Sequence, residues 1–419
     1  MTHSTTAPTP LLDGLRVLDL STMIAAPTTA TILGDYGADV VKVEMPGTGD
    51  FVRRFGRQKD GQGLYWKALS RGKRSVALDL RRPEGRDLVL RWVERFDVLI
   101  ENFRPGTLER WGLAPTDLRA ANPRLVVLRV TAYGQDGPYR DRPGFGTLAE
   151  ALAGLASVSG FEDRPPLLPA YPLADIMAGN LGATAVLAAL MRRNATGTGD
   201  TIDLAIYEAA LKLVEINVLE YQQTGSEHGR TGNRYGPAAP RGSYQCRDGL
   251  WIALSGSTQP MAQHVLRTIG GEQLVEDPRF RTNADRVRHV QELDDLIAGW
   301  CRTRDRDDAI AELTTGGCAV GPLESVATML DNPQVRHRGS IVTVEDDDLG
   351  PLAMTNVYPA FQDGGTAVGR PGPTHVGADT DDVLAADLGL GPEELAALRE
   401  AGVTTGPPTV PPAHEKDAV

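Results

Sequence analysis

The segment Gly14-Leu-Arg-Val-Leu-Asp-Leu20 starts at a turn-forming glycine and continues with closely spaced apolar residues, which is typical of a short buried strand. A helix is predicted over residues 27–36 and ends at Gly37. The segment Asp39-Val-Val-Lys-Val-Glu44 predicts a second strand, which stops at the turn of residues 45–50. Together these segments form a strand–helix–strand unit.

Strands and helices keep alternating through the first half of the chain. Further strands are predicted over residues 75–80, 97–102, 124–131 and 201–206. Helices are predicted over residues 83–95, 147–157 and 207–221, and another from about residue 173. Strands that alternate with helices form a mainly parallel sheet with helices on both faces. We therefore predict an α/β fold with a Rossmann-like, mainly parallel sheet in a large domain.

Changes in composition mark the expected domain boundaries. Residues 11–223 are predicted to form the first part of the large domain, and a polar linker begins at residue 224. Residues 224–323 contain two short strands joined by a tight turn and three helices, which predicts a smaller α+β domain. Residues 324–405 return to the large domain. The Thr/Pro-rich leader 1–10 and the Pro-rich tail 406–419 are expected to be disordered.

The composition excludes several classes of protein. With 41% hydrophobic and 23% charged residues, the chain has the make-up of an ordinary globular protein. Its 55 acidic and 43 basic residues give a net charge of −12, so nucleic acid is not an expected partner. The 3 cysteines and 7 histidines show no ligand spacing, which predicts no metal and a reducing compartment. There is no signal pattern and no apolar run of roughly 18 residues, so we expect a cytoplasmic protein with no membrane partner.

An acidic residue stands where a proline-rich segment meets a long apolar helix, in the sequence Leu168-Pro-Ala-Tyr-Pro-Leu-Ala-Asp-Ile-Met-Ala-Gly-Asn180. Pro169 and Pro172 keep the backbone extended, so the helix begins near residue 173. Asp175 then lies at the helix N-terminus, where free N–H groups and the helix dipole favour an ionised carboxylate. Asp175 is either a helix cap or a catalytic residue. Two glycines further along the helix predict close approach of another backbone or of a ligand.

In a parallel sheet, ligands bind at the carboxyl ends of the strands. The segment Asn102-Phe-Arg-Pro-Gly106 follows a predicted strand and offers an aromatic face and a guanidinium on which an adenine could stack. Residues 133–146 form a loop rich in turn formers with Tyr133 at its base, which is typical of a binding loop. The G-x-G-x-x-G fingerprint of dinucleotide-binding proteins is absent after the first strand. Basic residues near the strand ends either suit a ligand with several phosphates or form a solvated surface: Lys42, Arg53, Arg54, Arg71, Lys73, Arg74, Arg81, Arg104 and Arg110.

Several of these segments together carry a resemblance to a known family. They are Gly14-Leu-Arg-Val-Leu-Asp19, Leu33-Gly-Asp-Tyr-Gly-Ala-Asp-Val-Val-Lys-Val-Glu44, Lys73-Arg-Ser-Val-Ala-Leu-Asp-Leu80, Glu101-Asn-Phe-Arg-Pro-Gly106 and Leu173-Ala-Asp-Ile-Met-Ala-Gly179. In this order they resemble the class III coenzyme A transferases, the family that includes formyl-CoA and carnitine CoA-transferases and alpha-methylacyl-CoA racemase. The resemblance covers about residues 11–403.

The resemblance implies a reaction and the residues that perform it. Asp175 matches the nucleophile that attacks an acyl-CoA thioester, which gives an aspartyl–acyl anhydride and then an aspartyl–CoA thioester from which an acceptor carboxylic acid collects CoA. Tyr133 matches a tyrosine of the active-site loop. CoA contacts are implied at Ile24, Leu78, Arg81, Asn102, Phe103, Arg104, Arg110 and Trp111. In the family the CoA thioester is a substrate rather than a permanently bound cofactor, and two chains form an interlocked homodimer.

The resemblance also separates the branches of the family. The formyl-CoA branch has a glutamine at Ile24, a basic residue at Met45, a lysine at Thr131 and a glycine run at residues 235–240, so the departures here argue against a formyl or oxalyl substrate. The racemase branch has a histidine in a Gly-His-Asp segment, where this chain has Gly144-Phe-Gly-Thr147. Without that base, exchange of an α-proton loses one of its two acid–base partners.

Residues 145–151 are similar to the segment of family members that move CoA between small dicarboxylic acids, often from succinyl-CoA. A second carboxylate in the acyl group needs a cation, and Arg53, Arg54, Arg140 and Arg142 lie in the two loops best placed to supply one. We therefore predict a CoA-transferase with a dicarboxyl-CoA donor. The alternative within the family is an acyl-CoA racemase. Outside it, the alternatives are a nucleotide-linked oxidoreductase, which lacks its glycine fingerprint, and a CoA-binding regulatory protein, which would not need an intact catalytic loop.

Overall fold

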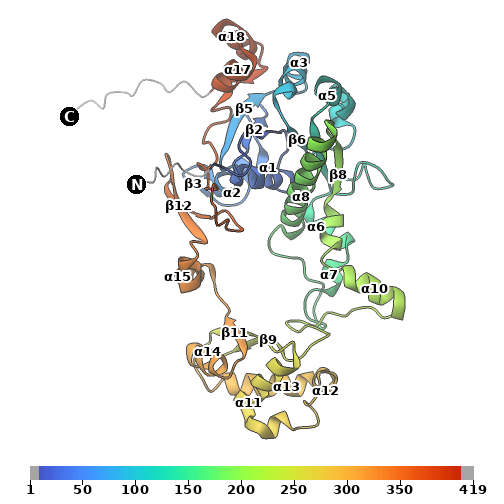
Figure 1. Ribbon diagram of the computed structural model, residues 1–419, viewed down its shortest axis with the longest axis vertical. Coiled ribbons are helices and arrows are strands. Elements are labelled where there is room, and N and C mark those ends of the chain that lie inside the picture. The colour runs from blue at the N-terminus through green and yellow to red at the C-terminus, as the bar shows by residue number, and fades with distance from the viewer. Residues whose placement is uncertain (1–8, 407–419) are drawn as a thin grey trace, which may run out of the picture. The chain divides into compact units, whose positions relative to one another are not determined.

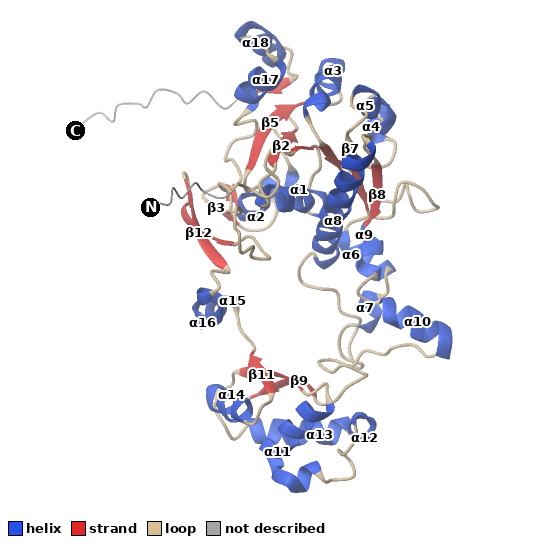
Figure 2. Ribbon diagram, in the orientation of Figure 1, coloured by secondary structure: helices blue, strands red, loops and turns tan. Residues whose placement is uncertain are grey.

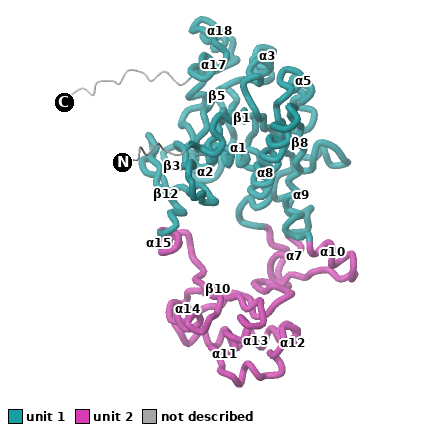
Figure 3. The backbone as a smooth tube through the Cα atoms, viewed as in Figure 1, with its two compact units in different colours: residues 1–155, 169–215, 337–419 teal, residues 156–168, 216–336 magenta. Residues whose placement is uncertain are grey.

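The computed structural model describes residues 9–406, which form two compact units. Unit 1 comprises residues 9–155, 169–215 and 337–406, and unit 2 comprises residues 156–168 and 216–336 (Figure 3). The predicted leader and tail lie almost wholly outside the described residues. Compared with the small domain expected over residues 224–323, unit 2 is longer at both ends and includes the separate segment 156–168.

Unit 1 is built around a sheet that, within the described residues, has seven strands in the order β14-β5-β2-β1-β6-β7-β8 (Figures 1 and 2). The parallel strands are β1 (Arg16–Asp19), β2 (Asp39–Glu44), β5 (Lys73–Leu78), β6 (Val98–Glu101), β7 (Val126–Thr131) and β8 (Thr201–Ala205). The short strand β14 (Thr404–Thr405) joins the edge antiparallel to β5. The strand order reverses between β1 and β6, as in doubly wound sheets. The predicted α/β class and the mainly parallel sheet are confirmed.

Helices cover both faces of this sheet, and each face has its own apolar core. One core contains Val17 and side chains of α1 (Ala25–Asp35), α6 (Gly146–Leu152), α8 (Leu173–Thr196) and α9 (Ile206–Leu211). The other contains Leu18 and side chains of α3 (Pro83–Trp92), α5 (Pro115–Ala121), α17 (Thr380–Leu388) and α18 (Pro392–Glu400). The neighbours Val17 and Leu18 serve opposite cores because successive side chains of a strand point to opposite faces.

Helices α1 and α8 lie directly against each other, because α8 has no side chain where α1 approaches. A Cβ at Gly179 would lie 2.5 Å from Thr28, and one at Gly182 would overlap Thr29. Thr29 donates a hydrogen bond of 2.9 Å to the Gly179 carbonyl. The predicted close approach at these glycines is confirmed, and it is α1 that approaches. Contrary to expectation, α8 is long and apolar enough to cross a membrane, but a core helix passes the same test and α8 belongs to the core of unit 1.

The remaining elements of unit 1 are short. They are η1 (Phe51–Arg54), β3 (Gln58–Lys59), β4 (Gln62–Gly63), α2 (Leu64–Leu69), η2 (Val93–Arg95), α4 (Thr107–Arg110), and the hairpin of β12 (Ile341–Asp346) and β13 (Gly350–Thr355). At the boundaries with unit 2 lie α7 (Leu155–Val158), α10 (Glu215–Thr224) and α16 (Pro333–His337).

Two helices that the sequence predicts as continuous are broken. The helix expected over residues 147–157 is divided into α6 and α7 at Gly154, whose φ of 80° is incompatible with a right-handed helix. The helix expected over residues 207–221 is divided into α9 and α10, because Leu213 and Val214 donate to carbonyls three residues back and not four.

Unit 2 combines an antiparallel sheet with a helical layer. Its strands are β9 (Arg241–Gln245), β10 (Trp251–Ser255) and β11 (Ala319–Pro322), in the order β11-β10-β9. Its helices are α11 (Gln259–Val275), α12 (Asn283–Arg288), α13 (Val290–Cys301), α14 (Arg306–Thr315) and α15 (Val326–Asp331). A separate apolar core, which includes Ile252, Phe280 and Ile297, holds the sheet and helices together.

Candidate active site

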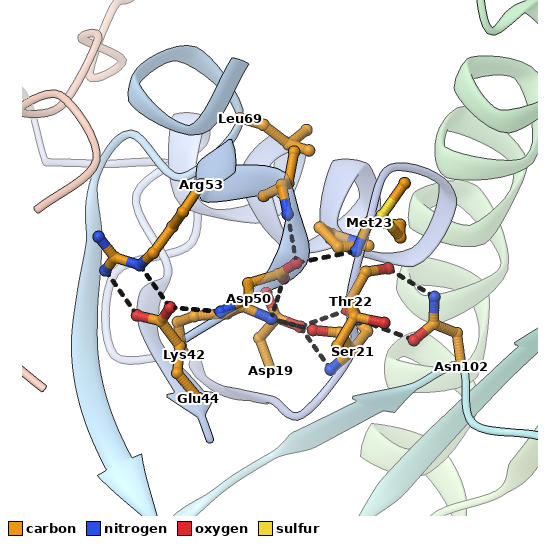
Figure 4. A network of polar contacts seen from close by, with 12 residues as sticks. Asp19, Ser21, Thr22, Met23, Lys42, Glu44, Asp50, Arg53, Leu69 and Asn102 are labelled. Carbon is orange, nitrogen blue, oxygen red and sulfur yellow. Dashed lines mark hydrogen bonds and ion pairs between the residues drawn. The ribbon is translucent and has the colours of Figure 1, made fainter. Parts of the chain in front are cut away.

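The sheet brings the carboxyl ends of β1 and β6 together at the point where its strand order reverses, which is where α/β sheets bind ligands. Asn102, directly after β6, joins these two ends. Its side-chain amide accepts a hydrogen bond of 2.8 Å from the backbone N–H of Thr22 and donates one of 2.6 Å to the Thr22 carbonyl (Figure 4). This reciprocal pair fixes the loop after β1 against the loop after β6.

Buried ion pairs support the loop after β1 (Figure 4). Asp19, the last residue of β1, accepts a hydrogen bond of 2.9 Å from Lys73, and Lys42 lies 3.2 Å from Asp50. These four residues are at most 3% exposed. Burial favours the neutral form of Asp19, but the two lysines outweigh it and lower its pKa. The two lysines are therefore structural, and their interpretation as phosphate ligands is wrong.

Three arginines near the strand ends form ion pairs with acidic residues of the protein. The Arg53 guanidinium makes hydrogen bonds of 2.6 and 2.7 Å to the Glu44 carboxylate and lies 3.7 Å from the Trp66 ring. Arg71 and Arg74 pair with aspartates at 2.5 and 2.6 Å. The interpretation of Arg53 and Arg71 as phosphate ligands is wrong, because acidic partners hold their largely buried side chains. The Arg74 side chain is 32% exposed, and its role stays a prediction. Arg53 is excluded in the same way as the cation for a second substrate carboxylate.

The turn between β1 and α1 is strained at Met23, whose φ of 67° is unusual for a residue with a side chain. Its N–H donates a hydrogen bond of 3.3 Å to Asp50, which ties the turn to the buried ion pairs. The turn leads into α1 with Ile24 as the N-cap residue, and no side-chain cap is made at this helix end among the described residues. Free backbone N–H groups and the positive end of the helix dipole therefore lie at the cavity that Ile24 and Ala25 line.

Asp175 lies in the first turn of α8 and lines that same cavity, which has a volume of about 120 Å³. Residues 22–25, Asn102, residues 130–132 and residues 144–145 form most of the remaining wall. Gly146 leaves room for the carboxylate, since a Cβ there would stand 2.6 Å from the Asp175 Oδ2 atom. The N-cap residue of α8 is Pro172, and within residues 9–406 the only side-chain acceptor for an N–H of the first turn is Glu150, so Asp175 does not act as the helix cap.

The surroundings of Asp175 make it more basic than an ordinary aspartate. Burial, followed by the nearby charge of Glu150, raises the pKa of Asp175 to about 6. The expectation that the helix N-terminus would favour the ionised form is wrong in direction, because desolvation outweighs the helix dipole. Glu150 is 2% exposed and accepts a hydrogen bond of 3.1 Å from the backbone N–H of Ala174. At neutral pH Asp175 is still mainly ionised, and its raised basicity makes it a stronger nucleophile.

A second cavity, of about 180 Å³, shares Asn102 and the end of β7 with the first. Tyr133, Arg140 and Arg142 are among the other residues that line it. The Arg142 guanidinium lies 3.6 Å from the Tyr139 ring, and that ring packs edge-on against Tyr133 at 5.7 Å. The loop of residues 133–146, predicted to bind a ligand, thus places two guanidinium groups one cavity away from Asp175.

The structure brings together only part of the site predicted from the sequence. Asp175, Ile24 and Asn102 line the first cavity, and Asn102, Phe103, Arg104 and Tyr133 line the second. Their roles in binding CoA and in catalysis stay predictions. The common location of these residues is the reversal point of the sheet.

Four predicted CoA contacts line neither of these two cavities. Leu78 is 1% exposed and belongs to the apolar core, so its side chain is not available to a ligand. Trp111 packs edge-on against Phe103 at a centroid distance of 5.0 Å and so supports that ring. Arg81 and Arg110 are exposed and remain candidates for phosphate contacts.

Sequence reasoning missed three residues that shape the site: Thr22, Gly146 and Glu150. Thr22 participates only through its backbone, which carries no signal in the sequence. Gly146 and Glu150 are four residues apart, so they lie on one face of α6. That spacing is visible in the sequence, but the packing of α6 on the first turn of α8 is not.

Comparisons with known proteins agree with this geometry. The sequence matches CoA-transferase family III over residues 12–380. It is 40% identical to Succinyl-CoA–D-citramalate CoA-transferase of Chloroflexus aurantiacus, over 93% of this chain and 96% of the relative. It is 38% identical to the Succinyl-CoA–L-malate CoA-transferase beta subunit of the same organism, over 94% and 98%. Among solved structures, a CAIB/BAIF family protein from Brucella suis superimposes with a TM-score of 0.79 at 31% identity, covering 91% of this chain and 99% of that one.

Proposed function

Because this chain belongs to CoA-transferase family III and transfers CoA between an acyl-CoA and a carboxylic acid, we propose that Asp175 is its nucleophile. The observation that carries the proposal is the position of the Asp175 carboxylate in a cavity at the reversal point of the sheet, with a pKa raised to about 6. A carboxylate that is not used as a helix cap is free to attack a thioester carbonyl. The oxidoreductase alternative is excluded by the family.

The reaction proceeds through two covalent intermediates on Asp175. The carboxylate attacks the thioester carbonyl, the C–S bond breaks, and a mixed anhydride and CoA thiolate form. The thiolate then attacks Cγ of Asp175, which releases the donor acid as a carboxylate and leaves an aspartyl–CoA thioester. The acceptor carboxylate reverses these two steps and departs as the new acyl-CoA. No proton is gained or lost in the cycle, and an activated acyl bond is kept at each stage.

Two features of the cavity favour this chemistry. A carboxylate is a much weaker base than a thiolate, so its attack on a thioester is uphill, and a raised pKa at Asp175 narrows that gap. The uncapped N-terminus of α1 lies at the same cavity and supplies N–H groups to the oxyanion that develops during attack.

We further propose that the acyl donor is a dicarboxyl-CoA such as succinyl-CoA. Arg140 and Arg142 line the cavity next to that of Asp175, where a guanidinium can bind the distal carboxylate of a short acyl chain. Arg54 lines neither cavity and donates 2.9 Å to the Thr48 carbonyl. The names of the relatives, which specify succinyl-CoA as donor, support the same substrate class.

The donor preference can be measured with two thioesters of equal chain length. Succinyl-CoA should exceed butyryl-CoA in kcat/KM with a common acceptor, and Arg142→Met should reduce that ratio roughly ten- to hundredfold, because a charge-assisted hydrogen bond is lost. Arg140→Met should act in the same direction, and Arg54→Met is the matched control that keeps the ratio. Equal kcat/KM for the two donors in the wild type would contradict the dicarboxylate proposal.

We also propose that the chain acts as an interlocked homodimer. The apolar side chains of Ile176, Leu181 and Met191 on α8 are 39%, 39% and 75% exposed, and a second copy would cover them. Such a dimer should persist on dilution, because threaded chains separate only by unfolding. Sedimentation that shows a folded monomer at micromolar concentration would contradict the proposal.

A further inference from the structure

Helix α6 presents two residues to the first turn of α8. Gly146 and Glu150 are separated by one helical turn and lie on the same face of α6. Gly146 leaves space for the Asp175 carboxylate, since a Cβ there would stand 2.6 Å from its Oδ2 atom. Glu150 accepts a hydrogen bond of 3.1 Å from the N–H of Ala174, the residue directly before Asp175. This face of α6 thus contacts both the backbone and the carboxylate of the proposed nucleophile.

Glu150 is a buried carboxylate with an unusual environment. It is 2% exposed, and no ion pair of the described residues includes it. Other buried glutamates of unit 1 are paired with a cation, as Glu101 is with Arg129 at 2.6 Å. Burying a carboxylate without a cationic partner destabilises the folded protein. A functional role for Glu150 would explain why it stands beside a second carboxylate. A like charge at short range makes the neighbouring carboxylate hold its proton more tightly.

We propose that Glu150 is a positioning residue that fixes the direction of Asp175 and increases its nucleophilicity, an inference that rests on the proposed role of Asp175 as nucleophile. The hydrogen bond to Ala174 holds the first turn of α8, and the neighbouring Glu150 carboxyl group makes the Asp175 carboxylate a stronger base. Burial first and then Glu150 raise the pKa of Asp175, which agrees with this role.

Among the described residues, Glu150 is the only titratable group that influences the pKa of Asp175 electrostatically. Within the described residues, the cavity wall formed by the β1–α1 turn, β6, β7 and α9 has no titratable side chain other than Asp175. Helix α1 presents Thr28 and Thr29 to α8. Tyr133 and the two arginines of its loop lie in the neighbouring cavity and are unchanged in the variants below. An acid limb that moves when Glu150 is replaced therefore reports on the influence of Glu150 on Asp175.

The test is the pH dependence of kcat/KM in Glu150→Gln and Glu150→Asp. Glutamine keeps an oxygen acceptor for the Ala174 N–H and removes the charge. We expect the acid limb of Glu150→Gln to move down by roughly one pH unit and the plateau rate to fall severalfold. Glu150→Asp keeps a carboxyl group on a shorter side chain. Its acid limb should therefore lie between that of the wild type and that of Glu150→Gln. Glu84→Gln, at an exposed first-turn position of α3, is the control and should match the wild type.

The outcomes separate this inference from the proposed function. A lower rate with an unmoved limb in both Glu150 variants would show a merely structural residue and overturn the inference. If Glu150→Gln does not fold, an unmoved limb in Glu150→Asp overturns it in the same way. The absence of any covalent adduct on Asp175 in the wild type, in contrast, would overturn the proposed function itself.

Discussion

Replacement of Asp175 by asparagine should stabilise the folded protein at neutral pH while it abolishes turnover. The folded-state pKa of Asp175 is about 6, against an ordinary value of 3.8. The folded protein therefore binds this proton more tightly than the unfolded chain does. As the pH rises through the window between these two values, the unfolded chain ionises first, and the wild type loses stability. Below this pH window Asp175 does not lower the free energy of unfolding, and above it the loss of stability is complete.

The magnitude follows from the size of the pKa shift. A difference of about two pKa units corresponds to about 3 kcal/mol as an upper limit, at 1.36 kcal/mol per unit. Asparagine loses the favourable interaction of a carboxylate with the helix N-terminus, which is about 0.3–1 kcal/mol. The net gain for Asp175→Asn at neutral or higher pH is then at most about 2–2.7 kcal/mol. This corresponds to a rise of several degrees in the Tm, at about 2–4 °C per kcal/mol.

Calorimetry of the wild type and of Asp175→Asn across the acid and neutral range measures this gain. The two proteins should have nearly equal Tm values at the acid end, and the variant should become the more stable one as the pH rises through the window. Asp163→Asn is the control, because the Asp163 side chain is 79% exposed, and it should show no such crossover. A variant that is less stable at neutral pH, or a difference that does not change with pH, would refute the reasoning.

Three further predictions follow from the same contacts. Wild-type kcat/KM should fall as the pH decreases through about 6, because protonated Asp175 is no nucleophile; a flat acid profile would contradict the raised pKa. Gly146→Ala should lower kcat at least about tenfold because its Cβ displaces the carboxylate, whereas Gly299→Ala, where a Cβ meets nothing within 4 Å, should keep kcat unchanged. Asn102→Ala removes the hydrogen-bond partner of both Thr22 backbone groups, so it should destabilise the protein by about 1–3 kcal/mol in thermal denaturation. It should also raise KM for the acyl-CoA, and an unchanged KM would show that other contacts hold the loop.

The strands and the chain order of the fold were predictable because each strand of the parallel sheet is a short apolar run between turn formers. The segments at β2 and β5 illustrate this, since their observed bounds differ from the predicted ones by at most two residues at each end. Helix continuity was not predictable in the same way. Gly154 fits an amphipathic pattern as well as a break, and only its positive φ decides.

The candidate site was predictable where a residue type and its place on an element coincide, as for Asp175 at a helix start and Asn102 after a strand. It was not predictable where long-range pairing decides the role. Lys73 reads as a surface cation in the sequence, yet it is buried against Asp19, 54 residues away along the chain. Glu150 carries no sequence signal of burial, but it is 2% exposed in the structure and contacts the first turn of α8.

Covalent trapping tests the role of Asp175 most directly. The wild type is incubated with succinyl-CoA in the presence of hydroxylamine, digested, and mapped by mass spectrometry. Both the anhydride and the thioester of Asp175 should be converted into a hydroxamate at this residue alone, and Asp175→Asn should give neither a hydroxamate nor turnover. A hydroxamate on another carboxylate, or CoA transfer that persists in Asp175→Asn, would contradict the assignment of Asp175 as the nucleophile.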